Sequence, residues 1–436
     1  MTQPLSRPHV TTSDPVRPRK PHPLALAFVA KSFLILAVSA LLAAPARAAD
    51  FFIKDNDRVV FLGDSITEYR MFTNYIEAYA LTRYPKWTLM FRNAGISGDV
   101  AGIGLSRIQR DVLPLHPTVV VVDYGMNDCG YMPNVGFSQA RYDDYVKNQT
   151  ALTQQLQKSG LRVVQLTTQP IEELPSVKDR ALPDQDVRNL ALRKFADGLK
   201  AVAHQCGVPF VDQFDPYMGI LVKARAADPL AFIGGCDAIH PGPPGNIIMA
   251  WAILKGLGAT PLVSTASIDA AGVRVQAVEG CQVTNLQVAS GVLSFDRLDV
   301  ALPMPIDRRA EVALKLAPII DDLDRYELKV EGLKADSYQL SIDGEAAGTV
   351  TNAALAKGWN MALTKGPIDK QAQDLLQLVF KKNDVYASRW QRGQVDPQRQ
   401  AELPKLDEEI ATLETQINAT REPKPHHFEL KPVAVP

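Results

Sequence analysis

Residues 58–65 read RVVFLGDS, a short apolar run that ends in a glycine and two polar residues. A run of this length that is bounded by a turn residue is typical of a buried strand. Similar runs follow along the chain, and TVVVV at 118–122 is typical of a strand that is covered on both faces. The other runs are residues 88–92, 162–166 and 208–211.

Longer segments in which apolar residues recur at helical spacing separate these runs. They are residues 69–83, 100–113, 139–158 and 187–205. Strands that alternate with helices predict right-handed crossovers and a parallel sheet with helices on both faces. In such sheets, binding sites gather at the carboxyl ends of the strands.

The pattern changes after residue 263. Residues 267–283 and 293–302 alternate with a period of two, residues 326–344 read as hairpin material, and helical spacing returns in 368–390 and 406–417. We therefore expect an α/β domain followed by a smaller β-rich region with appended helices. The expected boundaries are 49–263 for the α/β domain, 264–352 for the β-rich region, 353–420 for the C-terminal helices, and 421–436 for a Pro-rich tail that is extended or mobile.

The first 48 residues have the features of a secretory signal peptide. A basic leader precedes an apolar run at 32–44, and ARA at 46–48 provides a cleavage site. A retained membrane anchor is the alternative, but the run is shorter than the ~20 residues of a spanning helix. We expect residues 1–48 to be removed and the protein to be exported, to the periplasm or beyond the cell, without a membrane span.

Composition excludes several classes of protein. The 436 residues include 47 Lys and Arg against 48 Asp and Glu, and this balance gives no reason to expect a nucleic-acid partner. An apolar content of 46% and a charged content of 22% fit an ordinary globular protein. Four cysteines are too few for a fold built on disulfides.

Four short polar motifs lie where strands are expected to end or a helix to begin. They are GDS at 63–65, NAGISGD at 93–99, YGMND at 124–128 and DAIHP at 237–241, which precedes a helix opened by two prolines. Each motif alone has a structural explanation: a turn, a glycine loop, a helix cap and a structural histidine. Together, at one edge of a sheet, they can form one site.

These four blocks, in this order, resemble those of the SGNH (GDSL-type) serine hydrolases, over roughly residues 55–257. The resemblance implies the SGNH hydrolase fold, a three-layer flavodoxin-like parallel sheet, and an enzyme that hydrolyses esters. It implies that Ser65 is the nucleophile, His240 the general base and Asp237 its partner. The implied oxyanion donors are the Ser65 N–H, the Gly98 N–H and the Asn127 side chain.

The chemistry of these residues agrees with that assignment. A serine hydroxyl needs a nearby base at neutral pH, and an aspartate fixes the tautomer of that base. The α/β-hydrolase pattern G-x-S-x-G is absent from the chain, and Ser97, the other serine in a block, is better explained by its turn. No His-Glu-x-x-His pattern and no phosphate-binding glycine loop occur, so we expect neither a metal nor a cofactor.

Two further pairs of residues carry open alternatives. Cys129 and Cys236 flank the expected site and either form a disulfide or are two buried thiols. Trp359 and Trp390, outside the resemblance, either contact sugars or pack in the interior.

The expected function is that of an exported serine esterase that cleaves carboxylic esters through an acyl-serine intermediate. The expected partner is a small-molecule or polysaccharide ester, first of all an O-acylated carbohydrate, by analogy only. A lipid or lysophospholipid esterase is the alternative substrate class. A cell-surface binding protein with an inactive hydrolase-like domain and an acyltransferase are the alternative kinds of protein.

Overall fold

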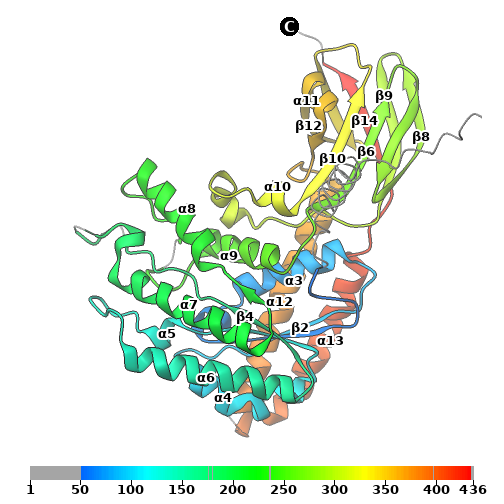
Figure 1. The fold of residues 1–436 in the computed structure, drawn as a ribbon. Helices are drawn as coiled ribbons and strands as arrows, with labels where there is room; N and C mark the ends of the chain where they lie inside the picture. Colours follow the sequence, from blue (N-terminus) through cyan, green and yellow to red (C-terminus); the bar gives the residue numbers. More distant parts are fainter. Residues whose placement is uncertain (1–50, 175, 179, 235–236, 396, 434–436) are drawn as a thin grey trace, which may run out of the picture. The chain divides into compact units, whose positions relative to one another are not determined.

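A parallel sheet of five strands is the centre of the first half of the chain in the computed structural model of this protein (Figure 1). The strand order is β2-β1-β3-β4-β5, which is the flavodoxin-like order. Every neighbouring pair is parallel, and the central strand β3 is buried along its whole length. The predicted fold class is therefore confirmed. The strands are β1 (Arg58–Gly63), β2 (Met90–Asn93), β3 (Val119–Asp123), β4 (Arg162–Leu166) and β5 (Phe210–Val211).

The structure describes residues 51–433 except 175, 179, 235, 236 and 396, and the side chains of 391–399 are also not described. The predicted signal segment, residues 1–48, lies outside the described residues.

Helices of the first half cover the two faces of this sheet (Figure 1). They are α2 (Ser65–Glu68), α3 (Met71–Arg83), α4 (Ala101–Arg107), α5 (Met126–Cys129), α6 (Gln139–Lys158), α7 (Val187–Cys206), α8 (Phe214–Ala227) and α9 (Pro243–Gly256). The predicted helix at 100–113 is divided, because α4 continues as a π-helical turn at 108–112 and a 3₁₀ turn at 113–115. The sequence analysis did not predict α8.

The second half contains two sheets. The four-stranded sheet has the order β13-β10-β6-β7, and the five-stranded sheet has the order β12-β11-β14-β9-β8. Their strands are β6 (Leu262–Asp269), β7 (Arg274–Glu279), β8 (Cys281–Ala289), β9 (Val292–Asp299), β10 (Arg325–Glu331), β11 (Ser337–Ile342), β12 (Glu345–Thr351), β13 (Trp359–Asn360) and β14 (His426–Pro432). The helices are η4 (Arg308–Lys315), α10 (Ile319–Leu323), α11 (Asn352–Lys357), α12 (Pro367–Val395) and α13 (Leu403–Thr420).

Residues 426–432 of the segment 421–436, which we expected to be an extended or mobile tail, form strand β14, so the expectation of a mobile tail is wrong for them. Strand β14 lies inside the five-stranded sheet and pairs with β11 on one side and β9 on the other. The side chains of Phe428 and Leu430 are fully buried there. Proline content suggested a loose tail, whereas the alternation of apolar and polar residues in HHFELKP is that of a strand.

The C-terminal helices pack against the first half of the chain. Helix α12 lies beside α3 (Figure 1), and the ammonium of Lys382 on α12 forms a buried ion pair with Glu77 on α3 at 2.5 Å. Buried side chains of residues 304–323 also belong to the hydrophobic cluster of the parallel sheet. The described residues between 51 and 433 accordingly belong to one compact unit. No helix among the described residues is long and apolar enough to cross a membrane.

Candidate active site

Ser65 lies at the turn between β1 and α2. The Asp64 carboxylate caps α2 by accepting the Ile66 N–H at 2.9 Å, and Ser65 is the first residue of the helix. A Cβ at Gly63 would lie 2.6 Å from the Asp123 carbonyl oxygen, so only glycine fits between β1 and β3 at this point. The strand therefore turns sharply and presents the Ser65 side chain at the carboxyl end of the sheet.

Ser65, His240 and Asp237 form one chain of hydrogen bonds. Ser65 Oγ lies 2.8 Å from His240 Nε2, although the two residues are 175 positions apart. On the other side of the ring, His240 Nδ1 lies 3.0 Å from Asp237 Oδ2. The structure thus brings together the three residues that the sequence analysis selected as nucleophile, base and partner.

The Asp237 carboxylate is held by its own turn. Its Oδ1 accepts the backbone N–H groups of Ile239 and His240 at 2.7 and 2.6 Å. Partial burial acts to raise the pKa of Asp237, but the hydrogen bonds from His240 and Ile239 outweigh it and lower the pKa below its usual value. The carboxylate therefore stays ionised beside the imidazole.

Neighbouring elements fix the loop that carries His240. The Gln169 side-chain amide donates to the Ile239 carbonyl at 2.8 Å, and the Asn246 amide donates to the Pro241 carbonyl at 2.5 Å. The ring of Tyr69 meets the His240 ring edge-on, with 4.9 Å between the ring centroids. Sequence reasoning missed Tyr69, although its place just after the Ser65 helix is a signal that it lies near the site.

The predicted oxyanion donors lie on the loops that follow β1, β2 and β3. Gly98 has a φ of +82°, a backbone conformation that favours glycine. The Asn127 amide donates to the Asp99 carbonyl at 2.8 Å, and it lies 3.4 Å from an oxygen of Asp64. Among the described residues, the backbone N–H groups of Ser65 and Gly98 donate to no protein acceptor.

Buried carboxyl groups cluster beside these segments. Burial raises the pKa of Asp64 to about 7 and the pKa of Asp128 to about 6. Burial also raises the pKa of Asp123 well above its usual value. Arg107 is the buried cation of the cluster, and it binds Asp99 at 2.6 Å and the Gly63 carbonyl at 3.1 Å.

Sequence reasoning also missed this cluster. Asp123 directly follows the buried run of β3, and a carboxyl group in that position was an available signal. The signal for Arg107 was weaker, because it sits in a helix with no motif of its own.

The alternatives left open by the sequence have different outcomes. Cys129 is a buried free thiol, whose pKa burial raises to about 12, and Cys236 lies outside the described residues. Trp359 and Trp390 are partly buried against the two main hydrophobic clusters, as the packing alternative states. The backbone N–H of Ser97 donates to Glu68 at 2.7 Å, and its hydroxyl binds the same carboxylate, so this serine belongs to the turn.

No three metal-binding side chains of the His, Cys, Asp and Glu types lie together in the part of the chain that the structure describes.

Comparison with known proteins places these residues in a family. Residues 61–247 match the sequence model of the GDSL-like Lipase/Acylhydrolase family. An acetylxylan esterase of Geobacillus stearothermophilus is 22% identical over 224 residues, which cover 47% of this chain and 96% of the relative.

A solved structure extends the similarity beyond the family region. A gut microbial diltiazem-metabolizing enzyme has a TM-score of 0.79 and 26% sequence identity, and the match covers 87% of this chain and 98% of that one. The predicted resemblance is confirmed over residues 61–247, which match the GDSL-like (SGNH) family, and the protein is an ester-hydrolysing enzyme.

Proposed function

We propose that this enzyme is an exported serine esterase that removes acyl groups from carbohydrates. The observation that carries the mechanism is the hydrogen-bonded chain from Ser65 through His240 to Asp237. The basic leader, apolar run and ARA site of residues 1–48 support export.

The geometry supports a two-step acyl transfer. Nε2 of His240 takes the proton of Ser65 as Oγ attacks the ester carbonyl carbon, and the carbonyl oxygen gains the negative charge. When the tetrahedral intermediate collapses, the C–O bond to the alcohol breaks and His240 gives the proton to the departing alcohol. Water then repeats the same sequence on the acyl-serine, which releases the carboxylic acid and restores Ser65.

Asp237 and the three donors support this transfer electrostatically. The ionised Asp237 carboxylate accepts a hydrogen bond from Nδ1–H, which keeps the proton on Nδ1 and leaves Nε2 free to receive the proton of Ser65. The N–H groups of Ser65 and Gly98 and the amide of Asn127 would stabilise the oxyanion, and the loss of one such donor typically costs about 3–4 kcal/mol.

The relatives support an acylated carbohydrate as the substrate class. One of them is named for acetylxylan, an acetylated polysaccharide. The other is named a diltiazem-metabolizing enzyme. We therefore propose that the acyl group is acetyl and that the alcohol is a sugar hydroxyl.

The test is the Ser65→Ala variant on acetylated xylan and on p-nitrophenyl acetate. We expect hydrolysis of both substrates to fall at least about a thousandfold, since the nucleophile is gone, and we expect a fluorophosphonate probe to label the wild-type protein alone. An Asp143→Asn variant, at an exposed position on α6, is the control. Full activity of Ser65→Ala would remove the mechanism, and a wild-type preference for long-chain esters would favour the lipid alternative.

A further inference from the structure

A polar hollow of about 370 Å³ is lined by Tyr69, which contacts His240, and by residues of the second half of the chain. This volume falls in the range of about 300–1,000 Å³ that is usual for ligand sites. Its walls include Tyr69 after α2, Asp307 and Arg309 at the start of η4, and Gln377, Phe380 and Asp384 on α12.

Tyr69 links this hollow to the reacting groups. Its backbone N–H donates to the Ser65 carbonyl at 3.0 Å, and its ring contacts the His240 ring. About half of the Tyr69 side chain (53%) is exposed. A ligand in the hollow would therefore touch a residue that itself touches the proposed base.

The position relative to His240 indicates which part of an ester the hollow would receive. In the proposed reaction, His240 gives its proton to the oxygen of the departing alcohol. That oxygen must lie on the His240 side of the ester carbonyl, whereas the Gly98 and Asn127 donors surround the carbonyl oxygen. Because Tyr69 both contacts the His240 ring and lines the hollow, a ligand in the hollow approaches the ester from the His240 side, where the alcohol departs.

The side chains of the hollow suit a neutral polyhydroxylated ring. Asp384 is largely exposed and carries one ion pair, to Arg70 at 3.1 Å. Asp307 accepts the Tyr75 hydroxyl at 2.8 Å and pairs with Arg309 at 2.7 Å. Asp307 is buried and occupied by these partners, whereas the exposed Asp384 carboxylate, the Arg309 guanidinium and the exposed Gln377 amide offer both donors and acceptors to hydroxyl groups.

Two further properties narrow the ligand class. The ring of Phe380 is partly exposed, with the Arg309 guanidinium 5.7 Å from its centroid, and its exposed part provides an apolar surface against which the C–H groups of a sugar can pack. Each carboxylate of the hollow pairs with an arginine, Asp384 with Arg70 and Asp307 with Arg309, so neither guanidinium is left unpaired to bind a phosphate or a carboxylate group. The hollow therefore fits a sugar better than a lysophospholipid.

We propose that this hollow binds the sugar alcohol of the substrate, so that η4 and α12 determine the specificity of the esterase. The proposal rests on the proposed function and adds to it the residues that select the alcohol. Asp307, Arg309, Gln377, Phe380 and Asp384 all lie outside the family region 61–247.

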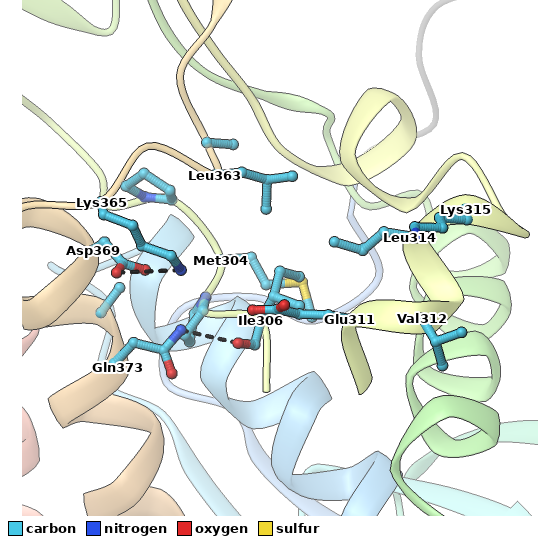
Figure 2. A pocket seen from close by; sticks show the side chains of 14 residues that line it. Met304, Ile306, Glu311, Val312, Leu314, Lys315, Leu363, Lys365, Asp369 and Gln373 are labelled. Carbon is cyan, nitrogen blue, oxygen red and sulfur yellow. Dashed lines mark hydrogen bonds and ion pairs between the residues drawn. The ribbon is translucent and has the colours of Figure 1, made fainter. Parts of the chain in front are cut away.

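A second hollow adjoins the same face of α12, closer to the N-terminus of the helix than the first hollow. Asp369 and Gln373 line this pocket of about 540 Å³ (Figure 2), and they precede Gln377 by two turns and one turn of the helix. Figure 2 shows Lys365 directed toward Asp369, at 3.5 Å, and Gln373 donating to the Ile306 carbonyl at 3.0 Å. From Asp369 to Asp384 the helix spans roughly 22 Å, enough for further residues of a sugar chain.

The test compares two substrates that share the acetyl group. One is p-nitrophenyl acetate, which has no sugar, and the other is an acetylated xylo-oligosaccharide. The quantity compared is kcat/KM for the oligosaccharide divided by kcat/KM for the aryl ester. We expect Gln377→Ala and Phe380→Ala each to lower this ratio about tenfold, because the KM for the oligosaccharide rises. An Asp374→Asn variant is the matched control, because Asp374 is exposed on α12, pairs with Lys370 and does not line the hollow.

A binding measurement tests the proposal without relying on catalytic turnover. Calorimetry should show that the oligosaccharide binds Ser65→Ala about tenfold more tightly than Ser65→Ala/Gln377→Ala. Equal affinities, or an unchanged ratio of kcat/KM in both single variants, would overturn the proposal. Failure of the proposed function looks different, since Ser65→Ala would then retain activity or the wild-type protein would hydrolyse neither ester.

Discussion

At the scale of single residues, Asp64 makes the stability of the protein depend on pH. Its carboxyl group is buried, and its pKa of about 7 in the folded state is far above the ordinary value of 3.8. The folded state therefore binds more protons than the unfolded state between these values. The free energy of unfolding falls as pH rises through this window, and the loss is complete above pH ~7.

Asp64→Asn should remove this dependence, because asparagine also caps helices and carries no charge. Relative to wild type, we expect the variant to gain about 2 kcal/mol of stability between pH 5.5 and pH 8.5. Urea unfolding at both pH values measures the difference. Asp143→Asn controls for the loss of one exposed charge. If the free energy of unfolding changed with pH by the same amount in Asp64→Asn and in the wild type, the prediction would be contradicted.

The sequence was sufficient to find the residues whose spacing is tied to chemistry. Ser65, Asp237 and His240 stand in short motifs, and the structure places their side chains within hydrogen-bond distance. Tyr69 and Arg107 were not found in the same way, because neither stands in a motif: the Tyr69 ring contacts His240, and Arg107 binds Asp99. A tyrosine after a turn and an arginine in a helix have no distinctive local pattern, and only the tertiary fold brings them to the site.

At the scale of elements, the prediction was reliable where a segment interacts mainly with its own neighbours. Helix α6 and strand β4 begin and end where the sequence places them. Strand β14 was misread because its partners are remote, with Phe428 opposite Phe295. The sequence also did not reveal that α12 packs on α3. A helix face that carries a charged residue is expected to be exposed to solvent unless the residue that pairs with this charge is known.

The buried pair between α3 and α12 gives a test of that packing. Lys382 Nζ lies 2.5 Å from Glu77 Oε1, and Asn383 also donates to Glu77, at 2.7 Å. Burial lowers the pKa of Lys382, whereas the carboxylate of Glu77 acts to raise it. We expect Lys382→Met to cost about 3–5 kcal/mol, because it leaves the Glu77 charge buried without its partner.

A double-mutant cycle distinguishes this pairing from simple loss of packing. The variant Glu77→Gln/Lys382→Met removes both charges of the pair, so it should be more stable than Lys382→Met alone. Denaturant unfolding of the wild type, both single variants and the double variant provides the cycle. Additive losses would show that the two charges do not interact. Lys370→Met, at an exposed position on α12, is the control substitution.

At the scale of the whole molecule, β14 is the strand on which the five-stranded sheet depends. It separates β11 from β9, and its Phe428 ring stacks on Phe295 with 5.2 Å between the centroids. Phe428→Ala should lower the free energy of unfolding by about 3–5 kcal/mol through lost burial and a residual cavity. Lys431→Ala, at a mainly exposed position on the same strand, should change it by less than about 0.5 kcal/mol.

Calorimetric melting checks both variants. Activity on p-nitrophenyl acetate at low temperature should survive in Phe428→Ala, because the parallel sheet and its hydrolase site have a separate hydrophobic cluster. Equal melting temperatures for the two variants would show that β14 is dispensable.

The placement of β14 also constrains the order of events during synthesis. A nascent chain that has left the ribosome only as far as α13 already contains every strand of the parallel sheet. In the five-stranded sheet, however, β9 and β11 each have an unpaired edge, because β14, which pairs with both, is still missing. Unpaired edges of this kind invite association between chains. The incomplete chain should therefore depend on chaperones until residue 432 has emerged. Slow translation of α12 and α13 would prolong this state and should lower the yield of soluble enzyme.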